Sequence, residues 1–214
     1  MAFSFVKVKD FIVGNIKVKQ FTEKLPTRGD NGIYYHSPNG CTVINNAAII
    51  WIPKNASSLL REVDKTYYDY SKVKVNEYWA ILRDPYQRWK SGACEFLLRY
   101  PEHSEYFYDN ISKIEFDAHT APQLRFLPIN EKINLVTLEG RGLEILHSRL
   151  NLFAKFGGID NVPTVNSSLN HQKSEIFKQL DQVIDRNLVK LIEEYYYDDM
   201  QLYSKVVKGE YATH

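Results

Sequence analysis

The chain has 214 residues, a length that one domain can fill while burying a sizeable hydrophobic core. Hydrophobic residues make up 44% and charged residues 25%, as is ordinary for soluble globular proteins. Lys and Arg number 27 against 26 Asp and Glu, so the formal net charge is +1. This balance gives no reason to expect nucleic acid or a membrane surface as the main partner, and any anion-binding site must be local.

Cysteine usage and hydropathy indicate a cytoplasmic protein. Cys41 and Cys94 are far apart and lack the CxxC spacing, so they do not predict a disulfide framework or a zinc site. Residues 1–19 interleave Lys with apolar residues and lack the apolar core of a signal peptide. No stretch is long and apolar enough to span a bilayer, so we expect no membrane anchor.

Short strands are predicted in the N-terminal part. Residues 3–9, 11–19 and 33–37 alternate or cluster β-formers, and Pro, Gly, Asn and Asp separate them. We therefore expect residues 1–46 to form a small β-rich elaboration of the domain. The apolar run at 47–53 then predicts a buried strand, with a polar loop and a helical rhythm after it.

The pattern of strand and helix then repeats along the chain. A second buried strand is predicted at 77–83, and Asp84 and Pro85 are typical of a helix start, as N-cap and first helical residue. A third strand is predicted at 132–138. Helical stretches are predicted at 86–100, at 140–155 and, as one long segment, at about 174–205. This alternation predicts one α/β domain over 1–214, a three-layer, P-loop-like sandwich with a central parallel sheet flanked by helices.

The loop after the first predicted core strand has the composition of an anion site. It reads Pro53, Lys54, Asn55, Ala56, Ser57 and Ser58. Between a strand and a helix, backbone N–H groups and hydroxyls neutralise phosphate oxygens, and a lysine adds a mobile positive charge. The glycines of a Walker A loop are missing, and the loop by itself could also be a capped helix start with a surface lysine.

A second cationic element follows the next predicted strand. Arg83 would lie at the carboxyl end of that strand, at the same edge of the sheet as Lys54. Arg88 and Ser91 lie one turn apart on the following helix. An arginine fork with a hydroxyl is a fitting receptor for a phosphate dianion, whereas the plain alternative is an amphipathic helix with solvated arginines.

Taken together, the two segments resemble the PAPS-dependent sulfotransferases, where PAPS is 3′-phosphoadenosine 5′-phosphosulfate. WIPKNASSLL (51–60) is similar to the family's 5′-phosphosulfate loop, and ILRDPYQRWKSG (81–92) to its 3′-phosphate segment. The resemblance is to the carbohydrate sulfotransferases of the chondroitin and dermatan type. Because the anchor and the cysteine pairs of the Golgi members are missing, it implies a soluble bacterial or viral member.

Three further stretches agree with that branch. Residues 117–123 are similar to its D-x-H-W-x-P-Q segment, although Thr120 stands where Trp is usual. Residues 162–168 resemble its proline and asparagine stretch, and residues 195–205 its terminal Tyr/Asp/Tyr helix. The resemblance covers about residues 47–205, the expected PAPS-binding catalytic core.

The resemblance implies a role for each matching residue. Lys54 would contact the 5′-phosphosulfate and stabilise the charge that develops on the bridging oxygen. The 5′-phosphate would be held by Asn55, Ala56, Ser57 and Ser58. The 3′-phosphate would be held by Arg83 and Ser91, with Arg88 assisting or lying on the surface. The product would be adenosine 3′,5′-bisphosphate.

The general base and the acceptor are less closely defined. His119 is the first candidate for the base because of its motif neighbours, with Glu95, Asp117 and Glu139 as the other candidates. The histidines show no metal-ligand spacing, so no metal is expected. The acceptor would carry a hydroxyl, with a carbohydrate as first choice. The oligomeric state is open.

Two other function classes remain as alternatives. A P-loop-like kinase would use ATP, but it predicts a glycine-rich loop and carboxylate ligands for Mg²⁺. A non-catalytic glycan-binding protein could keep the same fold and use an aromatic cleft. It would tolerate loss of Lys54, Arg83 or Ser91, and all three are present.

Overall fold

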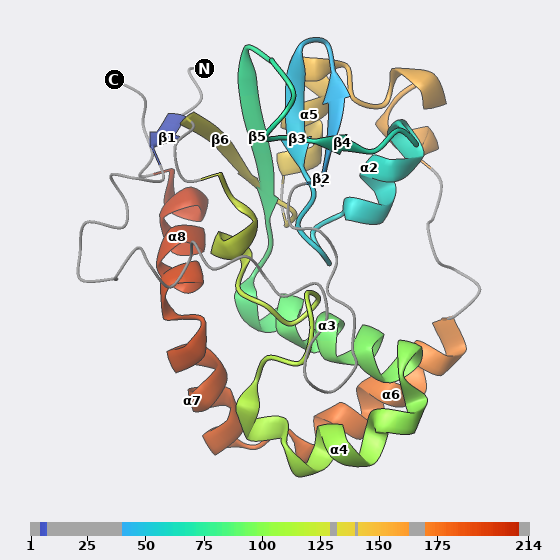
Figure 1. Cartoon of the computed structure of the whole chain (residues 1–214), viewed down its shortest axis with the longest axis vertical. Coiled ribbons are helices and arrows are strands. Elements are labelled where there is room, and N and C mark those ends of the chain that lie inside the picture. The colour runs from blue at the N-terminus through green and yellow to red at the C-terminus, as the bar shows by residue number, and fades with distance from the viewer. Residues whose placement is uncertain (1–4, 8–39, 129–131, 140, 163–169, 210–214) are drawn as a thin grey trace.

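A mixed sheet, with both parallel and antiparallel strand pairs, forms the centre of the protein (Figure 1). The computed structural model describes residues 5–7, 40–128, 132–139, 141–162 and 170–209. The strands follow the spatial order β1-β6-β5-β3-β2-β4. They are β1 (Phe5–Lys7), β2 (Gly40–Ile44), β3 (Ala47–Ile50), β4 (Tyr68–Asp69), β5 (Glu77–Leu82) and β6 (Lys132–Thr137).

The three predicted core strands are present, and they pair in parallel. β3 pairs with β5, and β5 with β6, whereas β1, β2 and β4 add to the sheet in antiparallel pairs. β1 and β2 therefore belong to the same sheet as the strands of the expected core. The strands predicted at 11–19 and 33–37 lie outside the described residues. β3 ends at Ile50, earlier than predicted, although Trp51 still donates its backbone N–H to Gly40 at 2.8 Å.

Both faces of the sheet are covered by apolar packing. Along β5, Trp79 and Ile81 point to one face and Ala80 and Leu82 to the other, as the two-residue period of a strand requires. On the first face, α2 (Ser57–Val63) and α5 (Gly142–Leu150) contribute Leu60, Leu146 and Leu150. On the second face, α8 (Tyr197–Lys208) contributes Leu202, which packs with Phe126. This burial of apolar surface is the main stabilising term of the sheet.

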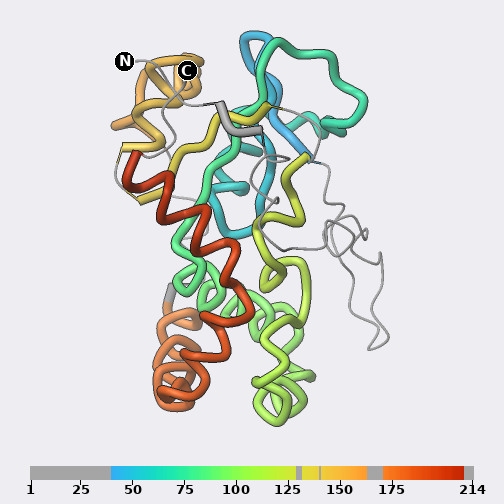
Figure 2. The backbone as a smooth tube through the Cα atoms, turned by 90° about the vertical axis from the view of Figure 1, so that its left-hand side faces the viewer, coloured from blue at the N-terminus to red at the C-terminus, as the bar shows by residue number. Residues whose placement is uncertain are grey.

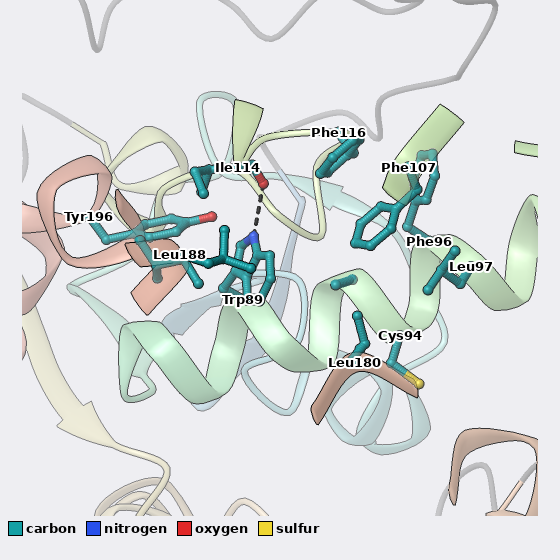
Figure 3. Close-up of a cluster of buried hydrophobic side chains, with 12 residues drawn as sticks. Trp89, Cys94, Phe96, Leu97, Phe107, Ile114, Phe116, Leu180, Leu188 and Tyr196 are labelled. Carbon is teal, nitrogen blue, oxygen red and sulfur yellow. Dashed lines mark hydrogen bonds between the residues drawn. The ribbon is translucent and has the colours of Figure 1, made fainter. Parts of the chain in front are cut away.

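A third apolar cluster lies among the helices at one end of the molecule. Figure 2 shows this helical end opposite the hairpin of β2 and β3. It is built around α3 (Pro85–Arg99), with α4 (Ser104–Asp109), α6 (Asn170–Val183) and α7 (Arg186–Tyr195). The fully buried Trp89 of α3 lies in its middle and donates Nε1–H to the carbonyl of Ile114 at 2.9 Å (Figure 3). This cluster fixes the direction in which α3 leaves the sheet.

The predicted start of α3 is confirmed, but the C-terminal prediction of one long helix is wrong. The Asp84 carboxylate accepts from Gln87 N at 2.8 Å and starts α3 at Pro85, as predicted. The C-terminal segment is three helices, because Asp185 caps a new start through Leu188 N at 2.8 Å and the chain bends again at Tyr196. Short 3₁₀ turns lie at Pro101–His103, Ile111–Lys113, Gln123–Phe126, Ala154–Phe156 and Ile159–Asn161. None of the described helices is long and apolar enough to cross a membrane.

Candidate functional site

A cavity of about 540 Å³ opens beyond the carboxyl ends of β3 and β5. Parallel strands end at the same edge of a sheet, so the segments after each strand meet there. The lining residues are Trp51, Pro53, Lys54, Ala56, Ser57, Ser58, Arg61, Tyr67, Arg83, Ser91, Glu95, Arg99 and His119. Seven of the predicted site residues are thus brought together from the loop after β3, the start of α2, the end of β5, helix α3 and the 117–123 segment.

The loop after β3 is held in an unusual backbone conformation. Lys54 and Ala56 both have positive φ, 69° and 62°, which costs a residue with a Cβ about 1 kcal/mol or more. The buried Asn55 between them fixes the loop. Its Nδ2 donates to the carbonyl of Ile81 at 2.7 Å and to Gln123 Oε1 at 2.5 Å. The side chain of Asn55 therefore points into the protein, and its expected part in phosphate binding is left to the loop backbone.

Lys54 lies within the cavity in an ion-pair chain. Its Nζ is 3.1 Å from Glu95 Oε2, and Arg99 Nε is 2.7 Å from Glu95 Oε1. Burial lowers the pKa of Lys54 below its usual range, and Glu95 partly opposes that shift. For Glu95, burial raises the pKa, but Lys54 and Arg99 outweigh it and bring the pKa to about 2. Glu95 is thus a permanent anion near neutral pH, which makes it a weak general base.

Arg83 and Ser91 both face the cavity, as predicted from the strand end and the helix spacing. Arg83 Nη1 donates to the carbonyl of Lys54 at 3.3 Å, and its Nε is 3.6 Å from Glu139 Oε1. The backbone of Arg83 is held on both sides by one amide. Gln123 Oε1 accepts from Arg83 N, and Gln123 Nε2 donates to Arg83 O, both at 2.9 Å.

His119 lines the cavity with its ring held from behind. Its Nδ1 is 2.6 Å from Asp117 Oδ2, and its backbone N–H donates to Asp117 Oδ1 at 2.8 Å. Because an ionised carboxylate only accepts, Nδ1 carries the proton and Nε2 is the basic atom of the neutral ring. Helix α3 supports this segment at close range. A Cβ at Gly92 would lie 2.2 Å from the carbonyl oxygen of His119.

The other candidate bases take different positions. Asp117 is buried and orients the His119 ring. Glu139 is not among the residues that line the cavity; its Oε2 accepts from Tyr203 at 3.1 Å. Burial, followed by Glu139, raises the pKa of Tyr203 to about 12, which keeps that hydroxyl a donor. His119 is therefore the candidate base with the most suitable geometry.

Arg88 is not brought to the cavity. It is fully buried, although the sequence places it beside Ser91 on the helix. Its Nε donates to Pro53 O at 3.0 Å and its Nη2 to Ala118 O at 3.3 Å, and its Nη1 donates to Ala121 O. The guanidinium lies 5.8 Å from the centroid of the Phe126 ring. Arg88 thus ties the loop after β3 to the His119 segment, rather than lying on the surface or facing a ligand.

Four cavity residues were missed by the sequence reasoning. They are Trp51, Arg61, Tyr67 and Arg99. Two of them have a sequence signal that helical periodicity could have supplied. Arg99 follows Ser91 and Glu95 at intervals of four residues, which places all three on one face of α3. Arg61 follows Ser57 at the same interval on α2.

Comparison with known proteins identifies no relative of this chain. The chain matches no protein-family model, no curated protein and no solved structure. Within the described residues, no group of His, Cys, Asp and Glu side chains could hold a metal ion. The stretch at 163–168 of the family resemblance lies outside the described residues.

Proposed function

We propose that the protein is a sulfotransferase that moves the sulfuryl group of PAPS to an acceptor hydroxyl, with a carbohydrate as first-choice acceptor. The observation that carries the proposal is the meeting of Lys54, Arg83 and Ser91 in one cavity. These residues are 37 positions apart at most in the sequence, yet they come from a loop, a strand end and a helix. The residue that completes the reaction chemistry, His119, lines the same cavity.

The donor set fits a ligand with two separate anionic ends. Lys54, in the loop after β3, and Ser57 and Ser58, at the start of α2, would receive the 5′-phosphosulfate. Arg83 and Ser91 would receive the 3′-phosphate, through a guanidinium fork and a hydroxyl. On this proposal the mixed sheet, with α2 and α5 on one face and α8 on the other, is a three-layer, P-loop-like sandwich.

The chain's own groups would then act on an in-line transfer. PAPS would supply an activated sulfuryl group on its 5′-phosphate. His119 Nε2 would take the proton of the acceptor hydroxyl as that oxygen bonds to sulfur, with Asp117 stabilising the imidazolium. Lys54 would exchange its contact with Glu95 for the bridging oxygen and stabilise the negative charge left there when the S–O bond breaks.

The test is transfer of labelled sulfate from PAPS to a panel of carbohydrate and phenol acceptors. We expect Lys54→Ala and His119→Ala each to lower kcat by about a hundredfold or more. The control is Lys72→Ala, which removes the same kind of charge from an exposed residue paired with Asp69. Turnover of Lys54→Ala within a few-fold of the wild type would refute the assignment, and phosphoryl transfer from ATP would favour a kinase.

A further inference from the structure

The two halves of the proposed donor site are joined behind the cavity by a pair of buried amides. Asn55 and Gln123 are each 1% exposed, and Asn55 Nδ2 donates to Gln123 Oε1 at 2.5 Å. Asn55 belongs to the loop after β3, and Gln123 begins the 3₁₀ turn Gln123–Phe126. Neither side chain is among those that line the cavity, so their part in binding would be indirect. We call these two side chains the amide pair.

Gln123 holds the end of β5 in place. Its carboxamide takes up both backbone groups of Arg83, in the way that a neighbouring strand would. The backbone of the turn is itself fixed from behind by helix α8. The buried Asp199 carboxylate accepts from Gln123 N at 2.6 Å and from Leu124 N at 3.1 Å. The carboxamide of Gln123 is therefore aimed at Arg83 by the fold.

Asn55 holds the loop at the point where the backbone is least relaxed. It lies between Lys54 and Ala56, which both have positive φ, and its Nδ2 also donates to Ile81 O at 2.7 Å. Residues with a Cβ favour negative φ, so this loop needs a restraint to keep its shape. With the restraint in place, the carbonyl of Lys54 accepts from Arg83 Nη1 at 3.3 Å.

These contacts close into a ring. Gln123 binds the backbone of Arg83, and the Arg83 guanidinium binds the carbonyl of Lys54. Asn55 follows Lys54 in the chain and leads back to Gln123 through its side chain. The loop and the arginine thus have one fixed spacing before a ligand arrives. Such preorganisation favours a ligand that spans both halves, because the ordering has already been completed on folding.

We propose that Gln123, acting through Asn55, is a positioning residue that couples the two halves of the donor site. It thereby sets the preference for a nucleotide with phosphates at both the 3′ and the 5′ position over a nucleotide with either one. This inference rests on the proposed function and deepens it, because it names a residue outside the cavity on which the specificity for the donor depends.

The experiment measures three nucleotides by calorimetric titration at a temperature where every protein is folded. They are adenosine 3′,5′-bisphosphate, 5′-AMP and 3′-AMP. Gln123→Ala should lower the affinity for the bisphosphate about tenfold or more, and that for each monophosphate by no more than about threefold. In Asn55→Ala, too, the bisphosphate should lose the most. The double variant should lose no more than about threefold beyond the larger single loss, because both changes remove the same link.

Gln179→Ala is the matched control, because Gln179 is an exposed glutamine of α6 that accepts from the Tyr108 hydroxyl at 3.4 Å. It should keep all three wild-type affinities. An unchanged affinity of Gln123→Ala for the bisphosphate, or equal losses for the three nucleotides, would overturn the coupling. If Gln123→Ala does not fold, Asn55→Ala decides by the same criterion. Failure of the wild type to bind the bisphosphate would instead refute the proposed function, so the two failures are distinguishable.

Discussion

Replacement of Arg88 by methionine tests whether this arginine holds the cavity together or contacts a ligand. The change keeps an unbranched aliphatic stem in the buried space and removes all guanidinium donors. The carbonyls of Pro53, Ala118 and Ala121 then lose their partners. Because Pro53 precedes Lys54 and the other two carbonyls flank His119, the variant loosens both sides of the cavity at once.

The expected cost follows from the contacts. A buried polar group left without its partner costs about 1–3 kcal/mol, and breaking a buried charged network typically costs about 3–5 kcal/mol. Removal of the charge offsets part of this loss, because the buried guanidinium is poorly solvated. The same burial lowers the pKa of Arg88. We expect a loss of about 3 kcal/mol in the free energy of unfolding. For a chain of this size that lowers Tm by about 6–12 °C.

The assay is thermal and chemical unfolding of wild type, Arg88→Met and Arg88→Lys. Lysine keeps the charge, but its single ammonium group cannot reach all three carbonyls. The stability of Arg88→Lys should therefore lie between those of the wild type and Arg88→Met. An Arg88→Met protein that unfolds within about 2 °C of the wild type would refute the reasoning. Loss of affinity for adenosine 3′,5′-bisphosphate at unchanged stability would restore Arg88 to the ligand-binding residues.

Three further changes have defined outcomes. Gly92→Ala places a methyl group against the His119 carbonyl and should cost about 1–3 kcal/mol in chemical denaturation, with a larger loss of transfer activity than of binding; an unchanged stability would contradict the close packing. Glu95 has a pKa of about 2, against an ordinary value of 4.5, so the stability it contributes is present above pH 4.5 and is lost as the pH falls towards 2. Denaturation curves of Glu95→Gln should therefore change less than those of the wild type over that interval. Burial raises the pKa of Asp199 from 3.8 to about 6, so the folded state binds the extra proton and stability should fall as the pH rises from 4 to 6. Asp199→Asn should lack this decrease, and an identical pH profile would contradict the shift.

The site residues that could be predicted are those positioned by rules of sheet and helix geometry. Lys54 and Arg83 follow parallel neighbouring strands, so they had to meet at one edge of the sheet. Asp84 and Pro85 fixed the start of α3, and with it the placement of Ser91. His119 was found by its motif neighbours. The sequence could not indicate that Asp117 would hold the ring from behind.

The residues that escaped prediction depend on tertiary packing. Arg88 and Ser91 are three positions apart, yet the packing of α3 against the 118–121 segment buries one and leaves the other in the cavity. The position of the Trp51 ring depends on Gly40, eleven residues earlier, because the missing side chain of Gly40 leaves space for the ring. The C-terminal segment has helical periodicity throughout, so periodicity alone predicts one helix. The break at Asp185 arises because the Asp185 side chain caps a new helix start, which competes with continuation of the first helix.

Arg61, Tyr67 and Arg99 line the cavity but lie outside the motifs that carry the resemblance. The two phosphate-binding motifs supply residues of the loop after β3, the start of α2, the end of β5 and the first two turns of α3. Arg61 and Arg99 reach the cavity through the length and direction of α2 and α3, which only packing defines. Glu95, by contrast, was proposed as a base on its type alone, and its ion pairs with Lys54 and Arg99 remove it from that role.

The central claim is a pocket that recognises a 3′-phosphate beside a 5′-phosphosulfate, and the most direct measurement is a comparison of thermal shifts. The wild type and Arg83→Gln are heated with adenosine 3′,5′-bisphosphate, AMP or ATP. At 100 times its Kd, a ligand adds about 2.7 kcal/mol, which corresponds to a Tm increase of about 5–10 °C. We predict this increase for the bisphosphate with the wild type, a much smaller one for AMP, and loss of the difference in Arg83→Gln. Equal shifts for the bisphosphate and AMP, or a shift with ATP alone, would contradict the account.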